Sequence, residues 1–423
     1  MTRRVVVTGL GVVTPLGSDL EEVWRRLLLG EVAVAAPRRF GAARPPTRAV
    51  GEVADEEVER LRREVGDDGT GMDLRTLFGV AAAQRAVAHA GLVVTEAARV
   101  GAAVASGPGA HRLEDFVRFR AADGGFDAAA LAAGRAGVHP GSLWRNPADR
   151  PATEVARRLG LGGPVHAVTT ACAASVQAIG SSLREIRAGR ADVMLAGGAD
   201  SMVDPLGLVF FVLLGAAASE EGPGACRPFS RRRTGIVTGE GAGIAVLEAE
   251  EHARARGAPI LAEVAGYGSS FDAFRVTAPH PEGRGAAEAM TKALADAGMA
   301  PEEVDFVSAH ATGTKLNDPA EAKAIRAVFG AHAARVAVSS GKSEMGHLLA
   351  AAGAVSFAGA VLSVARGAIP PTANLADVDP ACALDHVVGQ ARTGPVRAAL
   401  VNALAFGGHN ATIAVRRFQE PAP

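Results

Sequence analysis

The side chain best suited to chemistry in this sequence is Cys172, which lies where a strand should turn into a helix. Residues 165–170 are short and β-branched and follow the turn residues 162–164, a pattern that predicts a buried strand. Beyond the cysteine, apolar residues recur three and four positions apart until Gly189, which predicts a helix with a glycine at its C-terminal end. The free N–H groups and the dipole of that helix favour the thiolate over the thiol. A buried, inert cysteine is the usual alternative, but the small residues 169–175 leave this sulfur reachable.

Two histidines add acid–base and hydrogen-bonding groups to this nucleophile. His310 closes a predicted strand, and His347 lies in the glycine-containing segment 341–349. Each histidine alone could be a satisfied structural residue, but two histidines and Cys172 at neighbouring strand ends favour covalent catalysis. A third loop, 402–410, supplies glycines that let backbone N–H groups approach a substrate carbonyl. A glycine-rich turn between two strands would explain that loop equally well.

An internal repeat indicates how these residues are brought together. A helix, a glycine cap, a short acidic loop and a strand occur over 86–106 and again, with nearly the same spacing, over 293–310. A second echo relates the strand and helix around Cys172 to residues 336–367, which places His347 at the position equivalent to the cysteine junction. We interpret this pattern as an ancient duplication.

The duplication predicts two halves, an N-terminal half over 1–255 that carries the cysteine and a C-terminal half over 256–423 that carries the two histidines. Alternating strands and helices in each half predict mainly parallel sheets covered by helices, and therefore an α/β layered fold. Packing of the halves about a pseudo-twofold axis would bring the strand ends, and their loops, to one cleft.

The composition is that of an aliphatic α/β protein of 423 residues with a formal net charge of −1. Such a charge argues against general binding to nucleic acid or to an anionic membrane. The three cysteines, Cys172, Cys226 and Cys382, share no metal-type spacing and give no disulfide framework, so we expect no metal site and a cytoplasmic, reducing compartment. The most apolar run, 205–218, is too short to span a bilayer and predicts a subunit interface or a lid over a pocket.

The N-terminal segment begins like a dinucleotide-binding turn. A predicted strand over Val5–Thr8 is followed by Gly9 and Gly11. The fingerprint requires a third glycine where Thr14 stands, because that glycine lets the following helix pack closely. We therefore do not predict a nucleotide site.

Taken together, these motifs carry a family resemblance. The chain resembles the β-ketoacyl-acyl carrier protein synthases, closest to the type II elongating condensing enzymes of the thiolase superfamily. This resemblance implies a thiolase-like five-layered α/β/α/β/α fold of two duplicated halves, a homodimer, and decarboxylating condensation of a cysteine-bound acyl chain with malonyl-acyl carrier protein. The reaction would serve fatty acid, polyketide or polyene biosynthesis. The similarity covers nearly the whole chain and rests on residues 5–17, 170–172, 193–199, 239–243, 277–279, His310, Lys342, 346–347 and 406–408.

The resemblance also implies a role for each residue of the site. Cys172 would accept the acyl chain, and its N–H group with that of Phe406 would hold the tetrahedral oxyanion. His347 would donate a hydrogen bond to the enolate oxygen, and His310 would act as a donor that activates water in decarboxylation. Lys342 would orient this network.

Substrate contacts are implied in the same way. The phosphopantetheine is carried by the acyl carrier protein, so the chain is expected to need no cofactor of its own. The matching positions are Thr277, Thr312, Thr314, Gly407 and Gly408 for the pantetheine arm and Pro108 and Phe211 for the acyl pocket.

The sequence departs from the family pattern at several positions. Ser356 stands where the family usually has a glutamate tied to the lysine and histidine network. Arg275 replaces a frequent histidine, Ala311 a frequent glycine, and Leu404 a frequent phenylalanine. Such drift favours a specialised polyketide or polyene pathway over housekeeping fatty-acid elongation.

Other functions on related or unrelated folds fit less well. A biosynthetic thiolase needs a second reactive cysteine in a glycine-rich loop, and Cys382 lacks that loop. Initiating and chalcone-type synthases pair cysteine and histidine with asparagine, whereas the third group here is His347. Non-catalytic chain-length factors normally lack the cysteine, although this chain could form a heterodimer with such a partner. A cysteine hydrolase on an unrelated fold would show turnover without any carrier-protein substrate.

Overall fold

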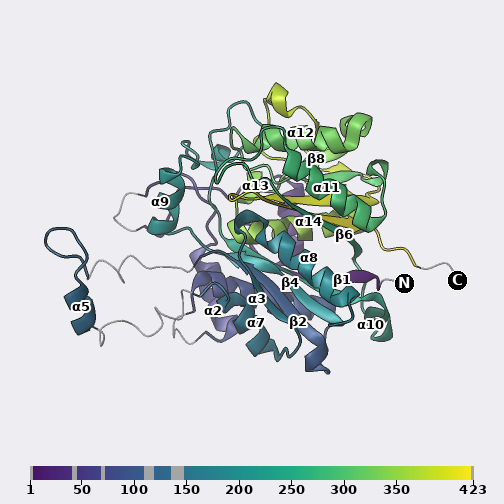
Figure 1. The fold of residues 1–423 in the computed structure, drawn as a ribbon, viewed down its shortest axis with the longest axis horizontal. Coiled ribbons are helices and arrows are strands. Elements are labelled where there is room, and N and C mark those ends of the chain that lie inside the picture. Colours follow the sequence, from purple (N-terminus) through teal and green to yellow (C-terminus); the bar gives the residue numbers. More distant parts are fainter. Residues whose placement is uncertain (1–2, 41–44, 68–71, 109–118, 135–146, 421–423) are drawn as a thin grey trace.

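A mixed sheet runs through the whole molecule and carries helices on both faces (Figure 1). The computed structural model describes residues 3–40, 45–67, 72–108, 119–134 and 147–420. Eleven strands follow the order β10-β8-β7-β12-β13-β6-β1-β5-β4-β2-β3. Their bounds are Val5–Val13 for β1, Val100–Ser106 for β2, Val165–Val168 for β3, Val193–Asp200 for β4, Gly241–Ala249 for β5, Ala262–Phe271 for β6, Phe306–Ser308 for β7, Ala337–Ser339 for β8, Asp385–His386 for β10, Ala398–Leu404 for β12 and His409–Arg416 for β13. The strands β9 (Ala368–Ile369) and β11 (Arg392–Thr393) pair separately.

The order of strands repeats in the two halves of the sheet. In the first half β3, β2 and β4 are parallel, and β5 and β1 then continue antiparallel. In the second half β8, β7 and β12 are parallel, and β13 and β6 continue antiparallel. The sheet is thus mixed, not mainly parallel as expected, because each repeat ends in two antiparallel strands. The boundary at 255/256 stays a prediction.

The two half-sheets meet at a short antiparallel junction between β1 and β6, through Val6 with Glu263 and Val7 with Ala262. At the far end of the first half, β3 is an edge strand with a neighbour on one side only. Residues 165–170 were expected to form a buried strand, yet β3 has only four residues, and Val165 keeps 39% of its surface exposed. The prediction of a buried strand was therefore wrong, because a short β-branched run fits an edge as well as a core.

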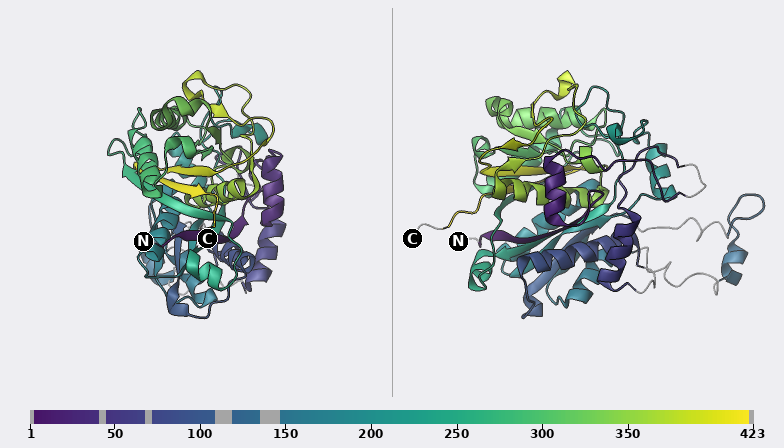
Figure 2. Two further views of the ribbon diagram at one scale, coloured as in Figure 1. Left: turned by 90° about the vertical axis from the view of Figure 1, so that its right-hand side faces the viewer. Right: turned by 180° about the vertical axis from the view of Figure 1, so that it is seen from behind.

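Helices complete five layers, as the resemblance implied, and Figure 2 shows them from two further sides. The helices α3 and α7 cover the outer face of the first half-sheet, while α11 covers the outer face of the second and α12 packs against α11. Between the half-sheets lie α8 and α14, which pack on strands of both halves and on each other. The bounds are Leu74–Ala90 for α3, Arg150–Leu159 for α7, Ala174–Arg187 for α8, Arg284–Ala297 for α11, Asn317–Phe329 for α12 and Ala352–Arg366 for α14.

Close packing in the aliphatic core explains the glycines that resembled a nucleotide motif. The strand β1 does not turn at Gly9 and Gly11 but continues to Val13. A Cβ at Gly9 would lie 2.3 Å from the Ala86 carbonyl oxygen of α3, and one at Gly11 would lie 2.0 Å from that of Ala82. These glycines therefore let a helix approach the strand, which agrees with the absence of the third glycine.

One helical stretch of the described chain, Leu349–Arg366, is long and apolar enough to cross a membrane. It comprises α14 and the 3₁₀ turn before it, and 78% of the stretch is buried inside the protein. Its apolar character is accounted for by its place between the two half-sheets.

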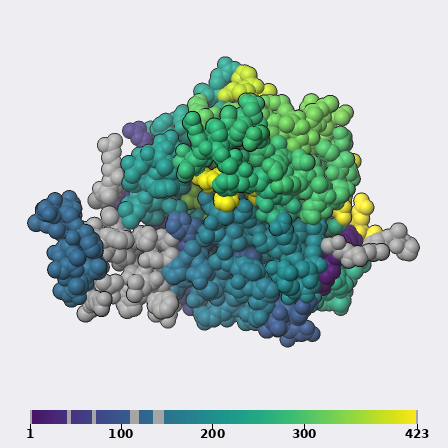
Figure 3. Space-filling model, viewed as in Figure 1, coloured from purple at the N-terminus to yellow at the C-terminus, as the bar shows by residue number. Residues whose placement is uncertain are grey.

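The remaining helices lie around this layered body. The apolar run 205–218 begins with α9 (Pro205–Leu213), in which the large side chains of Phe210 and Leu213 are 51% and 81% exposed. Figure 3 shows most of the C-terminal half in the upper part of the surface, with the N-terminal half below it and at the upper left. The other helices are α1 (Leu20–Leu28), α2 (Asp55–Val65), α5 (Ala128–Ala133), α9 (Pro205–Leu213), α10 (Glu250–Ala255) and α13 (Lys342–Met345).

Candidate active site

Cys172 lies in a tight elbow between β3 and α8. The 3₁₀ turn η3 (Ala171–Ala173) begins with Ala171 at φ +49°, a left-handed conformation that residues with a Cβ rarely adopt. The elbow leaves Cys172 half-buried at the wall of a cavity of about 430 Å³. A strained backbone maintained at a cavity wall is typical of functional sites.

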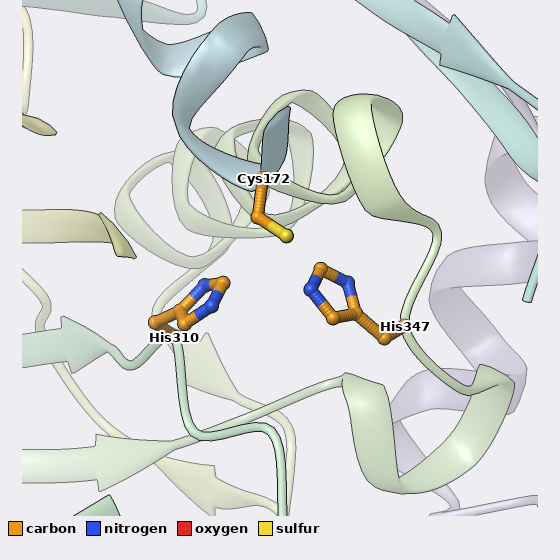
Figure 4. A group of neighbouring side chains, drawn as sticks. All are labelled: Cys172, His310 and His347. Carbon is orange, nitrogen blue, oxygen red and sulfur yellow. The ribbon is translucent and has the colours of Figure 1, made fainter. Parts of the chain in front are cut away.

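His310 and His347 reach the same cavity from the second half of the chain. His310 follows β7, and His347 follows α13, and both are almost fully buried. Their ring centroids lie 5.2 Å apart at an interplanar angle of 82°. Donor atoms of Cys172, His310 and His347 all lie within 4.8 Å of one another, and Figure 4 shows both rings beside the sulfur. The structure thus brings together the three residues that the sequence singled out.

The hydrogen bonds of His347 define which ring nitrogen carries the proton. The backbone N–H of Leu349 donates to Nδ1 at 3.1 Å, so the neutral ring holds its proton on Nε2. Nε2 is buried and has no hydrogen-bond partner among the residues that the structure describes. A buried donor without a partner, in a side chain that lines the cavity, is suited to bind a substrate oxygen.

The same geometry bears on metal binding. Cysteine and two histidines are a donor set that zinc accepts. A zinc ligand must offer a lone pair, however, and both nitrogens of His347 are committed, one to Leu349 and one to its proton. The arrangement therefore favours hydrogen bonding by this histidine over metal ligation.

Burial controls the protonation of all three residues. It lowers the pKa of His310 and of His347 well below 6.5, and the Lys342 cation lowers both further, so the two imidazoles are neutral at pH 7. Burial also raises the pKa of Cys172 to about 12, against the influence of Lys342 and of the backbone N–H groups of Cys172 and Phe406. The resting site therefore holds a thiol. The expected preference for thiolate is outweighed, because the loss of solvent exceeds the effect of the helix terminus.

The two N–H groups that act on the sulfur come from opposite halves of the chain. One belongs to Cys172 and the other to Phe406, in the turn between β12 and β13. Gly407 and Gly408 shape that turn at φ +87° and +90°. Their own N–H groups are bonded within the protein, to the carbonyl oxygens of Val276 and Ala405. The two glycines therefore shape the turn that positions the Phe406 amide, and their contact with the pantetheine arm stays a prediction.

Lys342 begins α13 and is buried, which lowers its pKa, while the nearby Glu321 carboxyl opposes that effect. Glu321 lies on α12 and accepts hydrogen bonds from the backbone N–H groups of His310 (2.8 Å) and Ala311 (2.7 Å). It also accepts from Nδ2 of Asn402 at 3.1 Å. The loop that carries His310 is therefore held by a buried acid that the sequence analysis missed. A signal was available, since Glu321 occupies the apolar stripe of α12 four residues before the buried Ile325.

Ser356 does not supply the acid of this network. It lies on α14 beside a separate cavity of about 40 Å³, which Ser308, Ser339 and Gly341 also line. The carboxyl group that acts most strongly on Lys342 is that of Glu321. Lys342 thus keeps an acidic neighbour although Ser356 stands where the family usually has a glutamate.

The predicted substrate contacts lie at different depths. Thr277, Thr312 and Thr314 line the cavity, and the hydroxyls of Thr312 and Thr314 lie 3.1 Å apart. Phe211 is buried on α9 in a cluster that includes Phe406. Pro108 is exposed and does not line the cavity, so its predicted place in the acyl pocket differs from its position here; the residues that follow, 109–118, lie outside the described part of the chain.

Comparisons with known proteins agree with this arrangement. Residues 2–253 match the N-terminal domain of beta-ketoacyl synthases, and residues 261–376 match the C-terminal domain. A 3-oxoacyl-[acyl-carrier-protein] synthase 2 from Synechocystis sp. is 38% identical over 99% of both chains.

Two solved structures are similar over 99% of this chain and 100% of theirs. A type II polyketide ketosynthase in complex with its acyl carrier protein gives a TM-score of 0.86 at 32% identity. The ishigamide ketosynthase/chain length factor gives a TM-score of 0.86 at 36% identity. The fold is thus that of the thiolase-like ketosynthases, and this chain belongs to the β-ketoacyl synthase family.

Proposed function

We propose that this chain is a β-ketoacyl-acyl carrier protein synthase, which condenses a cysteine-bound acyl chain with malonyl-acyl carrier protein and releases CO2. The observation that carries the proposal is the cavity in which Cys172, His310 and His347 bring their donor atoms within 4.8 Å of one another. No other described group of cysteine, histidine and acidic residues combines a nucleophile, two neutral imidazoles and a pair of convergent backbone amides.

The first step is transfer of the acyl chain from its carrier thioester to Cys172. The sulfur attacks the thioester carbonyl while its proton passes toward the neutral ring of His310, so no free thiolate has to form in the resting site. The oxyanion that forms receives the N–H groups of Cys172 and Phe406, an arrangement in which one donor is worth about 3–4 kcal/mol. Collapse of the intermediate forms the acyl-cysteine and expels the carrier thiolate, which takes up the proton.

The second step is decarboxylation of malonyl-acyl carrier protein beside the acyl-cysteine. The bond to the carboxylate breaks, CO2 leaves, and the electron pair becomes an enolate whose oxygen accepts from Nε2–H of His347. The enolate carbon then attacks the acyl-cysteine, the carbon–sulfur bond breaks as the β-ketoacyl carrier product departs, and the expelled sulfur takes up one proton from solvent water. Neutral imidazoles suit this step, because a donor near an enolate need not carry a charge.

The acyl carrier protein is the proposed partner, and its phosphopantetheine is the only prosthetic group required. The cavity mouth supports this, since Thr277, Thr312 and Thr314 can bond the polar arm. Arg275 and Lys315 add positive charge to the same lining, which suits the phosphate group of the phosphopantetheine arm. A related ketosynthase has been solved with its carrier protein.

A dimer is the proposed assembly. The exposed apolar side chains of α9, among them Phe210 and Leu213, and the free edge of β3 are surfaces that a second subunit would cover. The partner is a second copy or a related non-catalytic subunit, as in the solved ketosynthase/chain length factor. We place the enzyme in the cytoplasm, since its three cysteines are unpaired thiols.

Intact-protein mass spectrometry with a panel of acyl-carrier proteins tests the proposal. One acyl adduct should form per chain, and addition of malonyl-carrier protein should convert it into a β-ketoacyl-carrier product. Cys172→Ala should show neither. Hydrolysis of thioesters without adduct or condensation would contradict the proposal and point to a cysteine hydrolase. Light scattering of the chain alone, and with a candidate partner subunit, separates a homodimer from a heterodimer.

A further inference from the structure

Asp200 is a buried carboxylate for which the proposed reaction gives no role. It ends β4 and keeps 1% of its surface exposed. Its Oδ1 accepts from the backbone N–H of Ser201 at 2.9 Å, and its Oδ2 accepts from the backbone N–H of Ala350 at 3.0 Å. Gly107 packs so closely that a Cβ there would lie 2.6 Å from Oδ2. The carboxylate is thus fixed by contacts from three segments of the chain.

The Ala350 amide belongs to the turn that also orients His347. This 3₁₀ turn, η7 (Leu349–Ala351), begins with Leu349 at φ +52°, and the Leu349 N–H donates to Nδ1 of His347. Leucine rarely adopts this left-handed conformation, so neighbouring contacts must maintain it. The Ala350 amide is the next one along and is buried, and a buried amide requires an acceptor. Asp200 is that acceptor.

We propose that Asp200 is a positioning residue that holds η7 closed, keeps Nδ1 of His347 as an acceptor, and thereby leaves Nε2–H to the substrate oxygen. It acts through the backbone of Leu349 and Ala350. The inference rests on the proposed condensing function, because the enolate oxygen is the group that Nε2–H would meet.

The electrostatic surroundings of Asp200 agree with this role. Arg75 and Asp73, at the start of α3, face it, and so does the thiol of Cys172. Burial raises the pKa of Asp200 to about 6, while the Ala350 N–H, Arg75 and the Ser201 N–H hold it down. The group is therefore ionised at pH 7, and both of its oxygens are acceptors.

Asp200→Asn tests the proposal, because an amide offers one acceptor oxygen to two N–H donors. We expect the variant to acylate Cys172 at least as fast as the wild type, because loss of the Asp200 charge lowers the pKa of the thiol. It should nevertheless decarboxylate malonyl-carrier protein at least tenfold more slowly. In ¹⁵N-histidine NMR spectra, the His347 resonances should move from the Nε2–H tautomer toward the Nδ1–H tautomer. Unchanged His347 resonances would overturn the proposal.

Asp192→Asn is the matched control, since Asp192 immediately precedes β4 at the opposite end and pairs with Arg3 and Arg99. It should leave the His347 spectrum and decarboxylation as in the wild type, and a tautomer change in this control would overturn the specific role of Asp200. The spectrum does not depend on turnover. If the wild type decarboxylates no malonyl thioester while Asp200→Asn still shifts the tautomer, the positioning role stands and the proposed function fails.

If Asp200→Asn does not fold, the proposal can be tested on the wild-type protein by changing the pH. Protonation of Asp200, with a midpoint near its pKa of about 6, removes one acceptor just as the substitution does. When the pH is lowered from 8 to 5, the His347 resonances should then move toward those of the Nδ1–H tautomer, with a midpoint at the pKa of Asp200. They should not show the chemical shifts of an imidazolium ring, which is protonated on both nitrogens. A His347 spectrum that is constant over this range would overturn the proposal.

Discussion

The elbows η3 and η7 have nearly the same backbone and opposite uses. Each contains one residue in the left-handed region, Ala171 at φ +49° and Leu349 at φ +52°, followed at once by Cys172 in one elbow and Ala350 in the other. The Cys172 amide acts on the reacting sulfur, together with that of Phe406. The Ala350 amide is instead bonded to a carboxylate at 3.0 Å. One elbow thus keeps its amide for a substrate, and the other uses its amide to hold the turn.

The difference comes from the strands that face the two elbows. The η7 elbow packs on β4, which ends in Asp200, whereas η3 packs on β12, which ends in the apolar Leu404. A carboxylate facing η3 would bind the Cys172 amide and compete with an oxyanion for it. The repeated fold therefore supplies two similar turns, and the residue at the end of each facing strand decides which turn becomes an oxyanion site.

The largest expected effect comes from moving the nucleophile between the elbows. Cys172→Ala should reduce condensation by at least about 10³-fold, as loss of a covalent nucleophile does. Adding Ala350→Cys to that variant should restore nothing, because the amide at position 350 is bound to Asp200. Acyl adducts are measured by mass spectrometry, with Cys382→Ala as the control that should acylate normally. An adduct at position 350 would show that the elbows are interchangeable.

Removal of the η7 histidine should separate the two half-reactions. His347→Ala should still acylate Cys172, since Nε2–H of this ring is needed only for the enolate. Condensation should fall by about 10²–10⁴-fold, the usual contribution of a positioned proton donor. Single-turnover assays of acylation and of product formation measure the two steps, with the half-buried His386→Ala as the control. Normal condensation in His347→Ala would remove the role assigned to η7.

The two elbows also show which parts of the site could be predicted from the sequence and which could not. Cys172 and His310 were identified because each follows a short apolar strand, and His347 because it lies in a glycine-containing segment that the repeat relates to the cysteine junction. Asp200 was missed because its role depends on the backbone amide of Ala350, 150 residues away in the chain. Glu321 was missed because it binds the backbone amides of His310 and Ala311, which lie in a loop outside its own helix. The α/β class followed from the repeat and the five layers from the family resemblance. The antiparallel strands and the exposed edge of β3 depend on pairings that no local pattern specifies.

A smaller effect should follow from removing the positive charge of Lys342, at the start of α13. Burial lowers the pKa of His310 and His347, and the charge of Lys342 lowers both further. Lys342→Met should therefore raise both pKa values. The acidic limb of the pH profile for condensation should then move to higher pH by about one unit. The pKa of Cys172 should also rise, because Lys342 opposes the effect of burial there, and acylation should slow by roughly tenfold. Rates measured from pH 5 to 9 test both, with the exposed Lys323→Met as the control. If the acidic limb lies at the same pH in Lys342→Met and in the wild type, the charge of Lys342 does not lower the pKa of the two imidazoles.

The smallest expected effect comes from adding an acid beside α13. Ser356→Glu would place a carboxylate in the cavity of about 40 Å³ that Gly341 also lines, one residue before Lys342. A negative charge there raises the pKa of Lys342 and of both imidazoles, so the acidic limb should move upward. The shift should be only about half a unit, because Glu321 already opposes the desolvation of Lys342. Ser356→Gln has the same length without the charge and should leave the limb in place. Equal pH profiles for the two variants would mean that a charge in this cavity does not change the pKa of Lys342 or of the two imidazoles. Glu321 would then be the carboxyl group that sets the electrostatics of Lys342 and His347.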